Sequence, residues 1–538
     1  MPGLRAKGRA GAEPTIRRPP MNLLKSASTV SLLTLASRVT GLVREQLVAA
    51  TFGASAATDA FNVAFRIPNL FRRLFAEGAF SQAFVPVLAA TREAEGDAAT
   101  RSLIDAVATV LTWTLVAVCV LGVVAAPLLV LLIGAGLARF DTAVLLTRLM
   151  FPYIGFMSLV ALAAGILNTW KRFAVPAATP VLLNLCFIAA AWWGAPAFER
   201  RGWDPILALA AGVMAGGLLQ LAVQVPALAR LGLLPRVSLL PGRIAAAWRH
   251  PGVVRVLRQM APALLGVSVA QVSLVINTQI ASHVGVGAVS WLTYADRLME
   301  FPTALLGVAL GVVLLPQLSA ARAGGDAEAY SGLLDWGLRL VLLLALPCAI
   351  ALLVFPEALI AVLFHYGAFS ARDVAMTVLA LQGYGFGLLG LIGLKILAPG
   401  FYAREDVKTP MKVAVVALVL TQAMNLVFVP WLGHAGLALS IGVAALFNAA
   451  TLLVLLRRRG LYTPAPGWGG FALRVGAASA VLGGLLAVAA QRIDWIALQA
   501  HAGQRAGAIA AVLSGVALVY FVQLHLSGLR LAAFLRRG

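Results

Sequence analysis

Apolar residues along this chain form long uninterrupted runs that are separated by short polar stretches. Each run is about 20 residues long, which is enough for a helix to cross the hydrocarbon core of a bilayer. Apolar and polar residues do not alternate within the runs, so the pattern favours helices over the strands of a barrel. We therefore expect an all-α polytopic membrane protein with about fourteen transmembrane helices. The predicted helices begin near residues 28, 57, 102, 142, 177 and 205, then near 259, 288, 331, 373, 410 and 433, and two last runs cover 471–489 and 506–524.

Composition supports this class. The 538 residues have a mean hydropathy of +0.91, and only 12% are charged, whereas soluble domains have about 25%. The formal charge of +21 could indicate a nucleic-acid partner. Most of the excess lies in short loops between the apolar runs, as the positive-inside rule requires, so we expect no nucleic-acid partner.

The same loops predict the orientation in the membrane. Alternate loops are rich in arginine and lysine, and the richer set is expected to lie in the cytoplasm. This assignment puts both termini in the cytoplasm, in agreement with an even number of spans. The richer set contains Lys171 and Arg172, the segment Arg230 to Arg258, Arg404 to Lys412, Arg457 to Arg459, and the tail residues Arg536 and Arg537.

The sequence also contains an internal repeat. The stretch "ATDAFNVAFRIPN" from Ala57 resembles "AVSWLTYADRLME" from Ala288, at an offset of 231. Two further matches, "VPVLAA" with "LPQLSA" and one Thr-Pro pair with another, have an offset of 230. Each copy holds six predicted spans, so both enter the membrane in the same direction. This arrangement predicts two pseudo-symmetric six-helix lobes with a substrate site between them.

These observations divide the chain into five parts. Residues 1–20 form a basic extension that we expect to be disordered, and residues 231–258 form a basic cytoplasmic linker. The N-lobe covers 21–230, the C-lobe covers 259–460, and residues 461–538 supply two additional helices and a basic tail.

Charged residues occur inside the predicted spans, and on the second span they share one face. The spacing of three or four predicts a polar stripe of Asp59, Asn62, Arg66, Asn69, Arg73 and Glu77. The second copy repeats it as Ser290, Thr293, Arg297 and Glu300, with Asp296 beside it, and the first span adds Ser37, Arg38, Arg44 and Glu45.

Such a set of charges cannot face lipid. One charge at the bilayer centre costs about 2.5–3.5 kcal/mol, so half a dozen would exceed the net stability of a typical protein. The stripe must therefore line a water-filled cavity or bind a ligand. Arginine predominates, and its planar fork of donors suits phosphate oxygens. The pattern predicts an anionic, phosphate-bearing substrate.

Other residues offer weaker signals. Cys119, Cys186 and Cys348 lie singly in apolar runs, and the histidines lack metal-ligand spacing. We therefore expect no metal and no cofactor. No phosphate-binding loop of an ATPase is present, so we also expect no ATP-driven motor. The glycine-rich run Gly383 to Gly393 is compatible with a hinge or with close helix packing. Lys395 is interpreted as a snorkelling lysine.

Four long motifs carry a resemblance to a known family. They are "MNLLKSASTVSLLTLASRVTGLVRE", "TDAFNVAFRIPNLFRRLFAEGAFSQAFVPVL", "SWLTYADRLMEFPTALLGVALGVVLLPQLS" and "LAPGFYAREDVKTPMK". The chain from Met21 nearly to its C-terminus resembles the MurJ (MviN) family, bacterial lipid II flippases of the multidrug/oligosaccharidyl-lipid/polysaccharide exporter superfamily. The family usually begins at the counterpart of Met21, so residues 1–20 are an extension or follow from a misplaced start codon.

The resemblance implies a transporter rather than an enzyme. Members of the family move the undecaprenyl-pyrophosphate-linked peptidoglycan precursor from the inner to the outer leaflet of the bacterial cytoplasmic membrane by alternating access. It implies that Arg38, Arg72 and Arg297 hold the pyrophosphate with support from Arg44. It also implies that Asp59 and Glu300 pair with arginines when the cavity is empty or changes state. The matching substrate-binding positions are Ser37, Arg38, Arg44, Asp59, Asn69, Arg72, Ser290, Arg297 and Glu300.

Further expectations concern partners and alternatives. We expect a monomer in contact with membrane lipid. The resemblance implies coupling to an ion such as sodium or to the membrane potential, and it implies that the last two helices form a groove for the lipid tail. A glycan polymerase would need acidic residues in a large extracytoplasmic loop, and the candidate carboxylates are scattered singly. The alternative that stays open is an exporter of another polyprenyl-linked glycan, or of drugs, within the same superfamily.

Overall fold

The computed structural model describes residues 21–72 and 80–529, and all of the regular elements in this part of the chain are helical. The predicted extension 1–20, Arg73, Glu77 and the tail residues Arg536 and Arg537 lie outside the described residues. The elements are α1 (Met21–Phe52), α2 (Ala56–Phe71), α3 (Ser81–Val124), α4 (Ala126–Gly134), α5 (Phe140–Met150), α6 (Tyr153–Thr169), α7 (Ala174–Ala189), η2 (Ala190–Gly194), α8 (Ala195–Glu199), α9 (Leu207–Arg230), α10 (Pro241–Trp248), α11 (Pro251–Val284), α12 (Ala288–Pro302), η3 (Thr303–Val308), α13 (Ala309–Ala323), α14 (Ala327–Val354), α15 (Pro356–Phe364), α16 (Ala371–Tyr402), α17 (Lys408–Leu432), α18 (His434–Arg458), α19 (Trp468–Arg492), η4 (Ala497–His501) and α20 (Ala502–Leu526).

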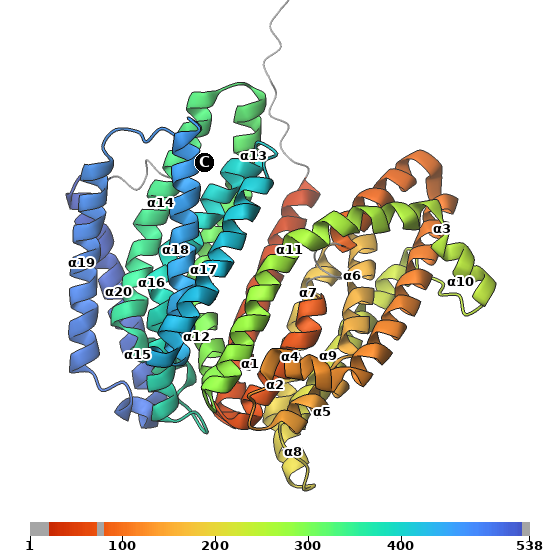
Figure 1. Cartoon of the computed structure of the whole chain (residues 1–538), viewed down its shortest axis with the longest axis horizontal. Helices are drawn as coiled ribbons and strands as arrows, with labels where there is room; N and C mark the ends of the chain where they lie inside the picture. Colours follow the sequence, from red (N-terminus) through yellow and green to blue (C-terminus); the bar gives the residue numbers. More distant parts are fainter. Residues whose placement is uncertain (1–20, 73–79, 530–538) are drawn as a thin grey trace, which may run out of the picture.

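The helices form two groups, with α11 running between them (Figure 1). Helices α1 to α9 pack on one another, as in the pairs α1–α7, α3–α6 and α7–α9, and we call them the N-lobe. Helices α12 to α18 form the C-lobe around α16, which contacts both α14 and α18, and α19 and α20 pack on its outer side. The lobes meet at one end, called the contact end, and diverge toward the opposite, wide end, where α1 begins (Figure 1).

Ten helices of the described chain are long and apolar enough to cross a membrane. They include the long helices α9, α14, α16, α17, α18 and α19, and this confirms the predicted all-α membrane class. The predicted count of about fourteen stays a prediction. Helices α1, α2, α11, α12 and α13 are absent from the ten, and most of them contribute the polar side chains between the lobes.

Two helix boundaries differ from the expectation. Helix α3 begins at Ser81, well before the predicted span start near 102, and Gly96 interrupts it with non-helical backbone at φ +79°. Helix α11 begins at Pro251, before the predicted start near 259. Proline is favoured in the first helical turn, and the His250 side chain accepts a hydrogen bond from Gly252 N (3.2 Å), so these two residues start the helix inside the predicted linker.

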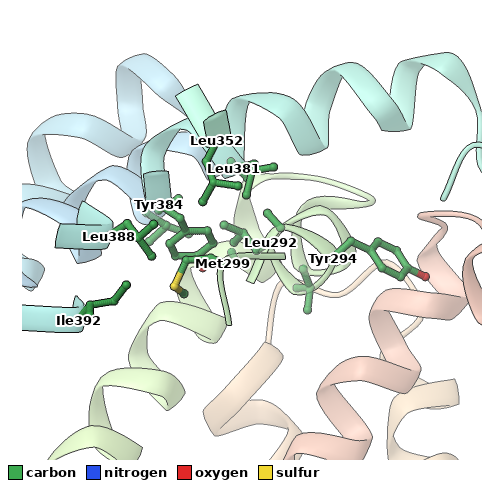
Figure 2. Close-up of a cluster of buried hydrophobic side chains, with 14 of the residues drawn as sticks. Leu292, Tyr294, Met299, Leu352, Leu381, Tyr384, Leu388 and Ile392 are labelled. Atoms are coloured by element: carbon green, nitrogen blue, oxygen red, sulfur yellow. The ribbon is translucent and has the colours of Figure 1, made fainter. Parts of the chain in front are cut away.

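The C-lobe is held together by apolar packing of α12 and α14 against α16. Figure 2 shows Tyr384 and Leu388 of α16 lying next to Leu292 and Met299 of α12. On another side of α16, a Cβ added at Gly387 would lie 2.1 Å from Gly442 Cα on α18. The glycine-rich run therefore provides close packing between α16 and α18, one of the two roles that its sequence allowed.

Candidate functional site

Helix α2 presents a polar face to the C-lobe. The helix starts at Ser55, whose hydroxyl accepts a hydrogen bond from Thr58 N at 3.3 Å, and apolar side chains such as Phe61 and Ile67 are buried within the N-lobe. Asp59, Asn62 and Arg66 each hydrogen-bond to the C-lobe or to α11. The predicted stripe therefore lies along the boundary between the lobes.

The first contact of this stripe closes the contact end. Asp59 accepts hydrogen bonds from Gly287 N (2.6 Å), Ser290 N (2.9 Å) and the Ser290 hydroxyl (2.6 Å). A carboxylate of the N-lobe thus caps the N-terminus of α12, where the helix dipole favours negative charge. The sequence-based expectation paired Asp59 with an arginine, whereas here its hydrogen-bond partners belong to the start of α12.

Close backbone contact supplements this cap. Ala368 N, in the loop before α16, donates to Ala50 O of α1 at 2.7 Å. Gly53 (φ +60°) and Gly367 (φ +54°) make the approach possible, because a Cβ on either would lie 2.5 Å or less from a carbonyl oxygen of the other lobe. At the contact end the lobes are therefore joined by hydrogen bonds and by close backbone packing at two glycines.

Two turns beyond Asp59 on α2, Arg66 reaches across to α11 and α12. Its guanidinium donates to the Thr278 hydroxyl on α11 and to the Thr293 hydroxyl on α12, the latter at 2.9 Å. Both partners are neutral, so these hydrogen bonds orient the guanidinium without neutralising its charge. Next to it, Asn62 donates to the Ser290 hydroxyl at 3.2 Å.

A second layer of charges joins α1 to α12. Glu45 of α1 pairs with its neighbour Arg44 and with Arg297 of α12, the latter at 3.3 Å. Arg297 also pairs with Glu300 at 3.0 Å, and Arg44 donates to Asn184 Oδ1 on α7 at 3.1 Å. Carboxylates and an amide therefore hold both guanidinium groups in fixed positions.

These layers form the wall of a cavity of about 1390 Å³ between the lobes. Five cationic side chains and two carboxylates line it, so the described wall has an excess of positive charge. The charged lining residues are Arg44, Arg66, Arg72, Arg297, Lys395, Asp296 and Glu300.

The predicted site residues fall into two groups. Ser37, Arg44, Asn69, Arg72, Arg297 and Glu300 line the cavity. Asp59 and Ser290 contact each other at the contact end instead, and the Arg38 side chain is exposed outside the described lining. Asn69 and Arg72 are joined by a hydrogen bond of 3.1 Å.

Several lining residues were not among the predicted site residues. Arg66 belonged to the stripe but not to the substrate-binding set, and Lys395 was interpreted as snorkelling, yet both line the cavity. Asn184 and Gln220 also line it from α7 and α9. An isolated amide within an apolar run was the available signal for these two, because burying such a group in lipid is costly.

Comparisons with known proteins agree on one family. The family profile described as lipid II flippase MurJ matches residues 48–501. A Burkholderia cenocepacia protein named lipid II flippase MurJ is 53% identical over 522 residues, covering 96% of this chain and 100% of the relative. A Vibrio cholerae protein named probable lipid II flippase MurJ is 41% identical over 478 residues, covering 86% of this chain and 88% of the relative.

Solved structures show the same fold. A structure described as lipid II flippase MurJ in an inward closed conformation has a TM-score of 0.73 at 22% identity, over 92% of this chain and 97% of that one. An inward-facing multidrug resistance MATE family transporter of the MOP superfamily has a TM-score of 0.64 at 14% identity, over 81% of this chain and 98% of that one.

Two helical lobes around a polar cavity, together with these structural matches, define a multi-pass membrane protein with the fold of MOP-superfamily transporters. The extent and identity of the sequence matches then identify the family: the chain belongs to the lipid II flippase MurJ family.

Proposed function

We propose that this chain translocates lipid II, the undecaprenyl-pyrophosphate-linked peptidoglycan precursor, from the inner to the outer leaflet of the cytoplasmic membrane. The observation that carries the proposal is the cationic cavity between the lobes, in a chain that belongs to the lipid II flippase MurJ family. The protein acts as a transporter and not as an enzyme.

The chemistry of the cavity supports a pyrophosphate ligand. Arg44, Arg66, Arg72 and Arg297 project into one cavity, and a guanidinium binds phosphate oxygens through two parallel N–H donors. Glu45 pairs with Arg44 and Arg297, and Glu300 pairs with Arg297. An entering pyrophosphate would replace these carboxylates as the partner of the two arginines. Arg38, outside the described lining, would join only after the lobes rearrange.

The size of the cavity also fits a large head group. Pockets for drug-sized ligands usually have volumes of about 300–1,000 Å³, and this cavity is larger at about 1390 Å³. The lipid tail would stay outside it, along the apolar surface that α19 and α20 add to the C-lobe. Both lobes come from one chain and the cavity is built within it, which supports a monomeric transporter.

Loop charges support an orientation with the wide end in the cytoplasm. The basic segment between α9 and α11 and the loop after α16 connect helices at the wide end (Figure 1). The positive-inside rule then puts both termini in the cytoplasm and makes this state inward-facing.

Alternating access would require the contact end, with Asp59 and Ala368, to open while the wide end closes. An ion gradient or the membrane potential would drive the cycle.

The test is the leaflet distribution of the lipid-linked precursor in cells depleted of this protein, measured with a probe that reaches only the outer face. We expect the precursor to accumulate in a form shielded from the probe. Precursor that still reaches the outer face would contradict the proposal and favour an exporter of another polyprenyl-linked glycan or of drugs. Ionophores that collapse either the sodium gradient or the membrane potential in undepleted cells identify the driving force.

A further inference from the structure

We infer that residues 233–249, between α9 and α11, form an interfacial segment that binds anionic phospholipid. This inference goes beyond transport, because it concerns the outer surface of the N-lobe and not the cavity. The segment consists of an extended stretch over 233–240 followed by α10. It contains Arg236, Arg243 and Arg249 and no aspartate or glutamate.

The segment is fixed along the outside of α3. Asp105 accepts a hydrogen bond from Arg236 N at 2.8 Å, and Thr109 accepts one from Ser238 N at 3.2 Å. One turn farther on, the Trp113 indole N–H donates to Ser238 O at 3.0 Å. The three α3 residues are spaced by four, so they form one row along the helix, and the segment runs beside this row.

This attachment lies at the boundary between polar and apolar surface. Asp105 is the last charged residue of α3, and residues 106–138 contain no Asp, Glu, Lys or Arg. The row from Asp105 to Trp113 therefore crosses from the polar part of α3 into the part that a bilayer must cover. Tryptophan is enriched at such boundaries because its ring is apolar and its N–H is polar. Trp113 and Trp248 are both exposed here, by 36% and 43%.

The two faces of the segment differ in their surroundings. Leu233 and Ala247 are buried in the N-lobe core with Leu103 and Ile104 of α3. Leu239 and Leu240 face away from the protein, and 76% and 58% of their surfaces are exposed. Large apolar side chains next to exposed arginines, on a segment held at the edge of an apolar helix, are typical of chains that insert into the headgroup region of a bilayer.

Charge selects the lipid. The segment has three exposed arginines and no carboxylate, so it attracts anionic headgroups. Each arginine near a membrane surface raises the binding affinity for anionic lipid about fivefold. Leu239 and Leu240 would insert beside the acyl chains while Arg236, Arg243 and Arg249 contact the phosphates. An anionic phospholipid such as phosphatidylglycerol is therefore the expected occupant, in preference to a zwitterionic one.

The test uses the full chain in vesicles, with a fluorophore at position 239 (Leu239→Cys) and Cys119, Cys186 and Cys348 replaced by alanine. Doxyl-labelled phosphatidylglycerol and doxyl-labelled phosphatidylcholine are compared as quenchers. We expect the anionic lipid to quench at concentrations at least fivefold lower. With the substitutions R236Q, R243Q and R249Q combined, the two lipids should quench at about the same concentration.

The matched control removes the same charge from exposed positions elsewhere, as R200Q, R201Q and R492Q, and should keep the preference. An equal loss in both variants would mean that only net charge matters, and would overturn the inference. Quenching by aqueous iodide but by neither lipid would also overturn it, because the segment would then face water or a protein partner. Thermal unfolding of each variant verifies that the fold is intact.

Discussion

Replacing Asp59 with asparagine should open the contact end of the molecule. In the structure this carboxylate accepts three hydrogen bonds from the N-terminus of α12, at 2.6, 2.9 and 2.6 Å. Hydrogen bonds to a charged group contribute about 1.5–3 kcal/mol each, and neutral ones about 0.5–1.5 kcal/mol. An asparagine keeps only one accepting oxygen, and its NH₂ group would face a donor.

We therefore expect D59N to weaken the contact by about 2–4 kcal/mol, which shifts the equilibrium between closed and open contact ends roughly 30- to 700-fold. The substitution S290A removes one of the three bonds and should have a smaller effect. Spin labels at positions 51 and 372, on the two sides of the Ala50–Ala368 hydrogen bond, report the opening in double electron–electron resonance. The native cysteines are replaced as above.

The wild type should give one short distance, and D59N should add a population at longer distance. D141N is the control, because Asp141 is an exposed carboxylate in the first turn of α5. Identical distance distributions for D59N and the wild type would refute the assignment of Asp59 to the closure of this end.

Three further predictions concern other parts of the chain. R297A should reduce the affinity of the purified protein for a polyprenyl pyrophosphate about 10- to 150-fold, because one charge-assisted hydrogen bond is lost. R322A, on the same lobe, should leave this affinity unchanged, and equal affinities of the two variants would contradict the role of Arg297. Hydrogen bonds from Thr409 and Arg459 lower the pKa of Asp406, in the loop after α16, from 3.8 to about 2. Its stabilisation is therefore complete above about pH 4 and is lost as the pH falls toward 2, so D406N should lower the melting temperature at pH 6 more than at pH 2.5. G387A should destabilise the protein by about 1–3 kcal/mol, because the added methyl group overpacks α16 against α18. G476A is the control, since a Cβ there meets no atom within 4 Å, and thermal unfolding should show no destabilisation.

Much of the fold could be predicted because lipid imposes a simple rule on sequence. A helix that crosses the bilayer core needs a long apolar stretch, and α14, α17 and α18 each contain one. The spans beginning near 57 and 288, which correspond to α2 and α12, were also predicted from apolar runs, and the repeat and its polar stripe then singled them out as the pair that carries charges.

The partners of the polar residues could not be predicted in the same way. Helical periodicity puts Asp59 and Arg66 on one face, but it does not say which residue of the other lobe faces them. The cap on α12 and the contacts of Arg66 with Thr278 and Thr293 depend on how the lobes dock. Lys395 was interpreted as a snorkelling lysine from its position near the end of its span, and its place in the cavity depends on the neighbouring helices.

The contact between Asp59 and Ser290 joins two positions that the internal repeat makes equivalent, since they are 231 residues apart. An equivalent pair that touches lies beside the pseudo-two-fold axis, with one residue on each side of it. A duplication of the N-terminal half would put two carboxylates face to face there, and their like charges would repel. With one acid and one hydroxyl, the pair attracts. Two copies of the N-terminal half would therefore lose this contact, because a carboxylate needs a hydrogen-bond donor opposite it.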